Sequence, residues 1–239
     1  MTDISKLNIK IFADGADLEQ ISALGADPLI KGFTTNPTLM RKAGVGDYRS
    51  FANEALKIVS PRPICFEVLS DNLDGMETQA RLIASWGDNV YVKIPITNTQ
   101  GLSTQPIIRR LSADGVKLNV TALMTLEQVE AAVSGLSSGT PAYISVFAGR
   151  IADTGRDPSP VIAEALKVLE QRPNGELIWS SPRELLNIFT ADHVGCHIIT
   201  VTHDILAKLS RIGMDLGELS LETIRMFERD ARQAGYELE

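Results

Sequence analysis

The strongest constraint on the fold is a regular alternation, along the whole chain, of short apolar runs with amphipathic segments. The amphipathic segments, such as residues 75–86, 125–136 and 160–169, repeat apolar residues every three or four positions, which is typical of helices that pack on one face. The apolar runs are rich in β-branched residues and predict strands. These eight runs comprise residues 9–14, 31–35, 64–68, 90–96, 117–122, 143–147, 176–180 and 198–202.

Strands that alternate with helices form parallel sheets, because each helix carries the chain back to the start of the next strand. Eight such units predict an α/β fold in which residues 1–239 form a single domain, a closed (β/α)8 TIM barrel. The alternative is an open, doubly wound sheet. The barrel is favoured because no Gly-x-Gly-x-x-Gly turn follows the first predicted strand.

One additional helix is predicted near the C-terminus, at about residues 220–235. Its Leu221, Ile224, Phe227 and Ala231 form an apolar stripe along one side. The stripe could cover the flank of the barrel or contact a neighbouring subunit of a homo-oligomer. The pattern alone leaves both alternatives open.

Composition and charge limit the partners that the chain can have. A formal net charge of -7 argues against nucleic acid, whose phosphates select basic surfaces. No apolar run approaches the length of a membrane span, and the first residues lack the apolar segment of a signal peptide, so a cytoplasmic protein is expected. Cys65 and Cys196 are then expected to be buried, reduced thiols rather than a disulfide.

A lysine interrupts the predicted strand at residues 90–96. Side chains alternate between the two faces of a strand, so that Val92, Ile94 and Ile96 are predicted to face the helices and Lys93 to face the barrel interior. A buried ammonium is costly unless another group neutralises it or a reaction uses it. One explanation is a structural ion pair with Asp14 or Glu67.

Further polar side chains are predicted to point into the same interior, which argues for a functional site. Barrel interiors normally hold branched apolar residues, and active sites lie at the carboxyl ends of the strands. Carboxylates are seldom buried without a task. The residues that converge there with Lys93 and Ser145 are Asp14, Glu67, Asn119, Thr121 and Phe147.

These residue types suit catalysis through a lysine Schiff base. A neutral lysine amine attacks a ketone, loses water and leaves a protonated imine, which withdraws electrons as the adjacent carbon-carbon bond breaks. A carboxylate must then move protons, and Asp14 is the candidate that takes the proton of the substrate hydroxyl. Glu67 and the Thr121 hydroxyl are the candidates for holding the water that is lost and regained.

Five segments of the sequence resemble the transaldolase family, which includes a small branch of fructose-6-phosphate-aldolase-like proteins. The resemblance spans most of the predicted barrel, and its most specific parts are Thr-Thr-Asn-Pro and Val-Lys-Ile-Pro at their separation. The segments are Phe-Ala-Asp-Gly-Ala-Asp (12–17), Gly-Phe-Thr-Thr-Asn-Pro-Thr (32–38), Val-Lys-Ile-Pro-Ile-Thr (92–97), Asn-Val-Thr-Ala-Leu (119–123) and Ser-Val-Phe-Ala-Gly-Arg-Ile (145–151).

The resemblance implies a role for each matching residue. It implies Lys93 as the Schiff-base lysine on the fourth strand, Asp14 as the acid and base, and Glu67 with Thr121 around the catalytic water. It also implies that Asn36, Asn119 and Ser145 bind the dihydroxyacetone unit, with Thr35 beside them. From the residues alone, Asn36 before Pro37 could equally be a turn residue.

Three positions separate the two branches of the family. The aldolase-like branch tends to carry Gln, Gly and Tyr where this chain has Glu67, Asn119 and Phe147. The resemblance therefore implies a transaldolase of the pentose phosphate pathway, which would move a dihydroxyacetone unit to an aldose phosphate from a ketose phosphate such as sedoheptulose 7-phosphate or fructose 6-phosphate. The alternatives are an aldolase-like lyase that uses dihydroxyacetone, a sugar-phosphate-binding barrel without catalysis, and an isomerase with Glu67 as its base.

The phosphate contacts are matched only in part. Arg150 matches the family's phosphate-binding arginine, and a guanidinium suits a phosphate because it binds in a bidentate manner. The usual Ser-x-Arg/Lys element after the seventh strand is replaced by Ile-Trp-Ser-Ser-Pro-Arg at residues 178–183, where Ser180, Ser181 or Arg183 could take its place. Alternatively, Ser181 and Pro182 only cap a helix at residues 183–190.

No sequence pattern indicates a metal or another cofactor. His193 and His197 are four residues apart, but Gly195 and a change from helix to strand separate them, so they would not share a helical face. Nor does any feature indicate a nucleotide. The expected partners are small sugar phosphates.

Overall fold

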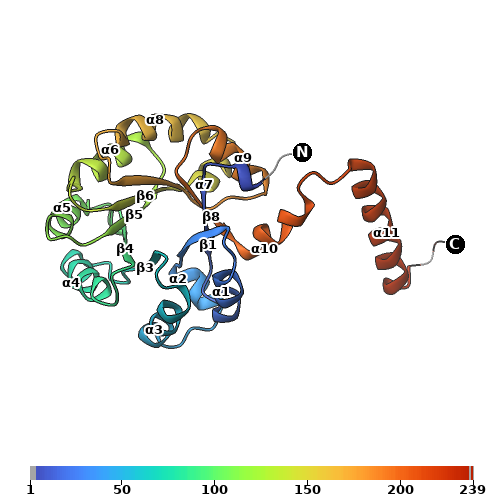
Figure 1. Ribbon diagram of the computed structural model, residues 1–239, viewed down its shortest axis with the longest axis horizontal. Coiled ribbons are helices and arrows are strands. Elements are labelled where there is room, and N and C mark those ends of the chain that lie inside the picture. The colour runs from blue at the N-terminus through green and yellow to red at the C-terminus, as the bar shows by residue number, and fades with distance from the viewer. Residues whose placement is uncertain (1–3, 237, 239) are drawn as a thin grey trace.

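The computed structural model describes residues 4–236 and 238, and its central element is a closed barrel of eight parallel strands in sequential order (Figure 1). The predicted (β/α)8 barrel is therefore confirmed, and each strand lies within one residue of its predicted bounds at both ends. The strands are β1 (Lys10–Asp14), β2 (Ile30–Thr34), β3 (Ile64–Glu67), β4 (Val90–Pro95), β5 (Leu118–Leu123), β6 (Ala142–Val146), β7 (Gly175–Trp179) and β8 (Ile198–Thr202).

Helices surround the barrel, and several begin at a side chain that caps their first turn. Asp17, Asn36, Asp47 and Asn72 each accept a hydrogen bond from a backbone N–H of the helix that follows. The helices of the barrel are α1 (Leu18–Gly25), α2 (Pro37–Lys42), α3 (Tyr48–Val59), α4 (Leu73–Ala84), α5 (Gln105–Ala113), α6 (Leu126–Gly135), α7 (Ala148–Ala152), α8 (Ser159–Leu169), α9 (Leu186–His193) and α10 (His203–Leu206). There are also two short 3-10 helices in the described part of the chain, Ile4–Lys6 and Ala207–Arg211.

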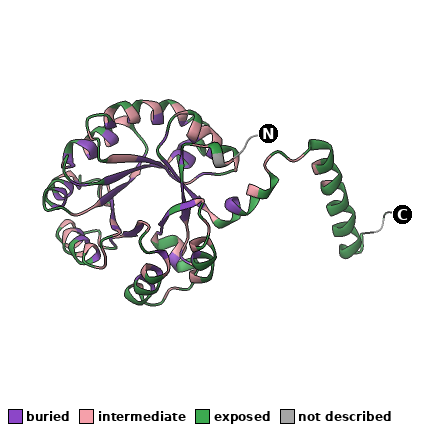
Figure 2. Ribbon diagram, viewed as in Figure 1, coloured by how far each residue is buried: buried purple, intermediate pink, exposed green. Residues whose placement is uncertain are grey.

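Most residues of the strands are buried, as the colours in Figure 2 show. One hydrophobic core lies between the strands and the helices and includes Val92 and Ile94, whereas a smaller cluster fills the barrel itself. The side chains of that inner cluster belong to Phe12, Cys65, Tyr143, Ile178 and Ile198, with Tyr91 packed against them. The predicted alternation along β4 is therefore confirmed, and it places Lys93 on the inner face. Cys65 and Cys196 are free and buried, as predicted.

A long helix, α11 (Leu216–Ala234), follows the barrel and extends away from it (Figure 1). It begins four residues before its predicted start, because Asp215 caps it by accepting hydrogen bonds from Gly217 and Glu218. None of its residues is buried, and Ile224 and Phe227 are 59% and 62% exposed. The helix thus does not cover the flank of its own barrel, which excludes one of the two alternatives for its apolar stripe.

In the described part of the chain, no helix combines the length and the apolar character that crossing a membrane requires.

Candidate active site

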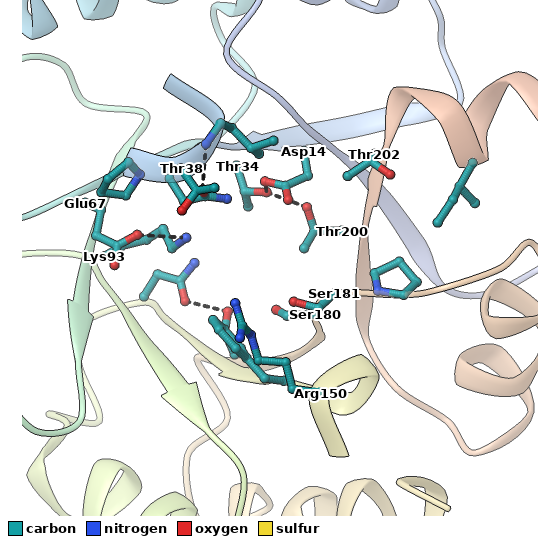
Figure 3. A pocket seen from close by; sticks show the side chains of 18 of the residues that line it. Asp14, Thr34, Thr38, Glu67, Lys93, Arg150, Ser180, Ser181, Thr200 and Thr202 are labelled. Carbon is teal, nitrogen blue, oxygen red and sulfur yellow. Dashed lines mark hydrogen bonds and ion pairs between the residues drawn. The ribbon is translucent and has the colours of Figure 1, made fainter. Parts of the chain in front are cut away.

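A cavity opens at the carboxyl ends of the strands, where sites in such barrels form (Figure 3). Side chains at or near the last residues of β1, β2, β3, β4, β6 and β8 reach it, Ser180 follows directly after β7, and β5 contributes Asn119 from its second position. The predicted residues that line the cavity are Asp14, Asn36, Glu67, Lys93, Asn119, Ser145, Phe147, Arg150, Ser180 and Arg183. The structure thus brings together ten of the twelve predicted side chains from distant parts of the sequence.

Lys93 is held between two neighbouring strands. Its side chain is almost fully buried, and its Nζ lies 3.2 Å from Oε2 of Glu67. The same nitrogen donates a hydrogen bond of 2.9 Å to the backbone carbonyl of Thr35. The ion pair follows from the register of the sheet, in which Glu67 of β3 lies directly beside Lys93 of β4.

Asp14 ends β1 and shares the cavity with this ion pair. The Thr34 hydroxyl donates a hydrogen bond of 2.7 Å to its Oδ1. Burial raises the pKa of Asp14 above its ordinary value, because the charged form loses its hydration. The Lys93 cation and the Thr34 hydrogen bond oppose this rise, whereas the Glu67 carboxylate adds to it. A carboxyl group with a raised pKa is suited to both accept and return a proton.

Asn119 and Ser145 form a fixed polar pair on the adjacent strands β5 and β6. The Ser145 hydroxyl donates a hydrogen bond of 2.7 Å to Oδ1 of Asn119, whose Nδ2 lies 3.3 Å from Sγ of Cys65. Asn119 and Ser145 are both buried except where they face the cavity. Their positions are thus set before any substrate is present, which favours precise binding of a small polar ligand.

Two predicted side chains do not line the cavity. The Thr35 hydroxyl points outward and donates to the carbonyl of Cys65 at 3.0 Å, so that only the Thr35 backbone contacts Lys93. Thr121 of β5 is in register with Pro95 of β4, and its hydroxyl oxygen is buried with no hydrogen-bond partner among the described residues. Since an unsatisfied buried hydroxyl costs free energy, Thr121 needs an explanation other than stability.

The Asn36 side chain both caps a helix and lines the cavity. Its Oδ1 accepts a hydrogen bond of 3.0 Å from the backbone N–H of Leu39, which caps α2, and Pro37 occupies the first turn of that helix. The same side chain lines the cavity. The turn role and a place in the site are therefore compatible, because the cap fixes the amide in one orientation.

The cavity ends at two arginines that differ in their pairing. Arg183 donates to Asp153 through Nε at 2.8 Å and through a second nitrogen at 2.5 Å, which is the bidentate geometry of a strong pair. Arg150 forms no ion pair within residues 4–236, and its guanidinium lies 5.7 Å from the centre of the Phe147 ring. Of these two arginines, Arg183 is thus the one that is held in an ion pair in the described part of the chain.

The backbone after β7 is arranged closely around this end of the cavity. Ser181 has a positive φ of 61°, and its carbonyl oxygen lies so close to Gly149 that an added Cβ would be 1.5 Å away. Glycine at position 149 therefore lets α7, which carries Arg150, contact the segment after β7. The alternative in which Ser181 and Pro182 cap a helix at residues 183–190 is wrong, because α9 begins only at Leu186.

The sequence interpretation missed further residues that line the cavity. Thr34 lies on β2, and Thr200 and Thr202 lie on β8. All three are on the inner face of the barrel, near the carboxyl ends of their strands. The alternation that identified Lys93 would have found them, if it had been applied to these strands too. Thr38 and Asp204 lie at the starts of α2 and α10, where no such alternation exists.

The comparisons with known proteins point to one family. Residues 11–238 match the family described as transaldolase/fructose-6-phosphate aldolase. A protein of Streptococcus pyogenes named probable transaldolase is 34% identical over 204 residues, which is 85% of this chain and 91% of that protein. A protein of the same name from Streptococcus equi subsp. zooepidemicus is 34% identical over 203 residues, 84% of this chain and 90% of its own.

Solved structures with low sequence identity share only the fold. A dihydrodipicolinate synthase family protein from Coccidioides immitis superposes with a TM-score of 0.57 at 12% identity, over 84% of this chain and 68% of that one. The structure titled KGPDC, from Streptococcus mutans, gives a TM-score of 0.55 at 11% identity, over 84% of this chain and 90% of that one. The barrel is therefore shared widely among chains whose sequences differ.

Proposed function

Because the chain belongs to the transaldolase/fructose-6-phosphate aldolase family, we propose that it transfers a dihydroxyacetone unit from a ketose phosphate to an aldose phosphate through a Schiff base on Lys93. The observation that carries the proposal is the position of Lys93. Its amine lies in the cavity between Glu67 and Asp14, and few other reasons exist to bury a lysine beside two carboxylates in a barrel interior.

The proposed reaction begins with attack of the Lys93 amine on the ketone carbon. Glu67 is close enough to Nζ to move protons between the amine, the carbinolamine hydroxyl and the departing water. The Thr121 hydroxyl, which has no partner among the described residues, is suited to hold that water. Loss of the water leaves the protonated imine.

In the proposed cleavage step, the Asp14 carboxylate takes the proton of the hydroxyl on the far carbon of the breaking bond, and that carbon becomes the aldehyde of the leaving aldose. The electrons of that bond move towards the imine nitrogen, and an aldose leaves. The Asn119 and Ser145 pair is placed to hold the hydroxyls of the three-carbon unit that stays on Lys93. Addition of a second aldose then reverses these steps.

The phosphate of either sugar is assigned to Arg150, because Arg183 is paired with Asp153. Ser180 is buried at the same end of the cavity and offers a hydroxyl. As part of the same proposal, the protein is a cytoplasmic enzyme of the pentose phosphate pathway, whose substrates are such sugar phosphates.

Trapping of the imine tests the proposal directly. Borohydride reduction with fructose 6-phosphate, followed by peptide mass spectrometry, is expected to give a stable adduct on Lys93 and none in Lys93→Ala. Adding erythrose 4-phosphate then separates transfer from simple cleavage, since turnover should rise strongly only with the acceptor. An unmodified Lys93 after trials with several ketose phosphates would overturn the proposal.

A further inference from the structure

Two hydroxyls that the proposed reaction does not use lie behind Asp14. Thr34 on β2 and Thr200 on β8 reach each other inside the barrel, on either side of β1 (Figure 3). Both residues are buried, with 2% and 5% of their surfaces exposed. Their hydroxyl oxygens are in hydrogen-bond contact, and Thr34 is also in contact with Oδ1 of Asp14.

The number of protons limits how this chain of contacts can be arranged. A threonine hydroxyl has one proton to donate and can accept as well. When the Thr34 proton is donated to the Asp14 carboxylate, the contact between the two threonines can be a hydrogen bond only if Thr200 donates to Thr34. The order is then Thr200 to Thr34 to Asp14, in which each hydroxyl polarises the next.

We propose that Thr200 is a positioning residue for Asp14: by donating to Thr34, it commits the Thr34 proton to Oδ1 and leaves Oδ2 to exchange a proton with the substrate. This inference rests on the proposed function, in which Asp14 is the acid and base. A proton that Asp14 takes from a substrate hydroxyl is thus kept on the oxygen that can return it.

The surroundings of Asp14 offer few other groups that could orient its carboxyl. The titratable groups that act on it come from β3 and β4, namely Glu67, Cys65 and Lys93. From the flanking strands, the Thr34 hydroxyl of β2 donates to it and the Thr200 hydroxyl of β8 contacts Thr34. Below the pair, the Phe12 ring occupies the place where a side chain on Gly32 would be, so that an apolar floor separates the threonines from the rest of the interior.

Replacing Thr200 by valine keeps the shape of the side chain and removes the hydroxyl. The Thr34 hydrogen bond to the carboxylate should then weaken, because the charged form of Asp14 loses the polarising neighbour. The pKa of Asp14 is expected to rise by roughly a few tenths of a unit, because a polarising neighbour contributes only a fraction of the hydrogen bond that it strengthens. Thr200→Ser, which keeps the hydroxyl, is expected to leave the pKa near its wild-type value.

The experiment is a titration of Asp14 by nuclear magnetic resonance with aspartate labelled at the carboxyl carbon. The Asp14 signal is the one that disappears in Asp14→Asn, and its midpoint is compared among wild type, Thr200→Val, Thr200→Ala and Thr200→Ser. Thr140→Val is the matched control, since Thr140 is buried and donates to the Ser112 carbonyl at 2.8 Å away from the cavity. Circular dichroism establishes that each variant is folded.

A midpoint raised in the valine and alanine variants but not in the serine variant or in Thr140→Val supports the proposal. In the active enzyme, the acid limb of the pH profile of kcat should move to higher pH, with little change in KM. The proposal is overturned if the folded valine and alanine variants keep the wild-type midpoint, or if the serine variant shifts as much as they do. Because the titration needs no substrate, its outcome is distinct from a failure to trap the imine on Lys93.

Discussion

Lys93 and Glu67 face each other across two adjacent strands, with Nζ and Oε2 separated by 3.2 Å. A pair of this kind has two explanations, since structural ion pairs and catalytic pairs both place opposite charges together in an interior. The sequence left both explanations open. The cavity in front of the pair favours the catalytic explanation, because a structural pair needs no access to a ligand.

Glu67→Gln should therefore slow the formation and hydrolysis of the imine, because an amide cannot move protons to and from water. We expect kcat to fall by about 100-fold or more, with the adduct on Lys93 forming slowly but to completion. Single-turnover trapping with borohydride measures the rate. Glu176→Gln is the matched control, because Glu176 pairs with Lys10 at 2.7 Å near the opposite ends of the strands. Equal rates in the two variants would contradict the role of Glu67.

Asp14→Asn should retain imine formation and lose cleavage. The expected fall in kcat is roughly 10²- to 10⁴-fold, the usual contribution of a positioned acid or base. In the wild type, the reaction needs the carboxylate, and burial raises the pKa of Asp14. Activity should thus fall with decreasing pH at values above the ordinary carboxyl pKa of 3.8. Activity that persists unchanged in the variant would exclude Asp14 as the base.

Asp14→Asn should lower activity but raise the stability of the protein relative to wild type. A raised pKa in the folded state means that folded Asp14 binds more protons than unfolded Asp14, so its contribution to stability is lost as pH rises from 3.8 through the folded pKa. Asparagine has no such loss. The free energy of unfolding of Asp14→Asn relative to wild type should increase across this range and then stay constant, as measured by urea unfolding at several pH values.

The two arginines allow a test of phosphate binding with an internal comparison. Arg150→Ala is expected to raise KM for phosphorylated substrates by about 10- to 100-fold, since a bidentate arginine contact to phosphate is lost. Arg183→Ala should have a smaller effect, because Asp153 already holds that guanidinium. Arg156→Ala provides a control at an exposed arginine outside the cavity. If Arg150→Ala impairs turnover of unphosphorylated dihydroxyacetone equally, Arg150 does not act through the phosphate.

Much of this arrangement could be predicted because strands impose an alternation on their side chains. The bounds of the strands follow from the lengths of the apolar runs in the sequence. The inward orientation of Lys93 and Asn119 follows from the alternation of side chains between the two faces of a strand. Segments without that alternation were less predictable. The start of α9 at Leu186 depends on how the chain turns after Ser181, and the pairing of Arg183 with Asp153 joins two loops that the sequence does not relate.

The alternation of side chains also shows that a residue within a matching motif need not point into the site. Thr35 lies within the matching Thr-Thr-Asn-Pro segment, yet it points away from the interior because its neighbour Thr34 points inward. The resemblance indicated the segment, and the alternation of β2, continued one residue beyond its end at Thr34, distinguishes the two threonines. The outward hydroxyl of Thr35 fixes the backbone through Cys65 and presents a carbonyl to Lys93.

The exposed apolar stripe of α11 predicts self-association, the alternative that remains after its own barrel is excluded. A helix of 19 residues with no buried side chain gains little from packing and is expected to be covered in solution by a second copy of the chain. Phe227→Asp combined with Ile224→Asp should lower the mass measured by light scattering. Glu222→Lys, on the polar side, is the control. A monomeric wild type at micromolar concentration would contradict this expectation.

Thr121 offers a test that separates a catalytic role from a structural one. Its hydroxyl oxygen is buried without a partner in the described part of the chain, so that valine, which has the same shape, removes an unsatisfied polar atom. Thr121→Val is expected to leave the free energy of unfolding unchanged or to raise it by about 1 kcal/mol. If the hydroxyl holds the catalytic water, kcat should nevertheless fall by about 10-fold or more, because imine formation and hydrolysis both use that water.

Thr104→Val is a suitable comparison for stability, since the Thr104 hydroxyl donates to the Pro95 carbonyl at 2.6 Å and its loss should destabilise the fold. A Thr121→Val protein that is less stable yet fully active would assign the hydroxyl a structural role instead.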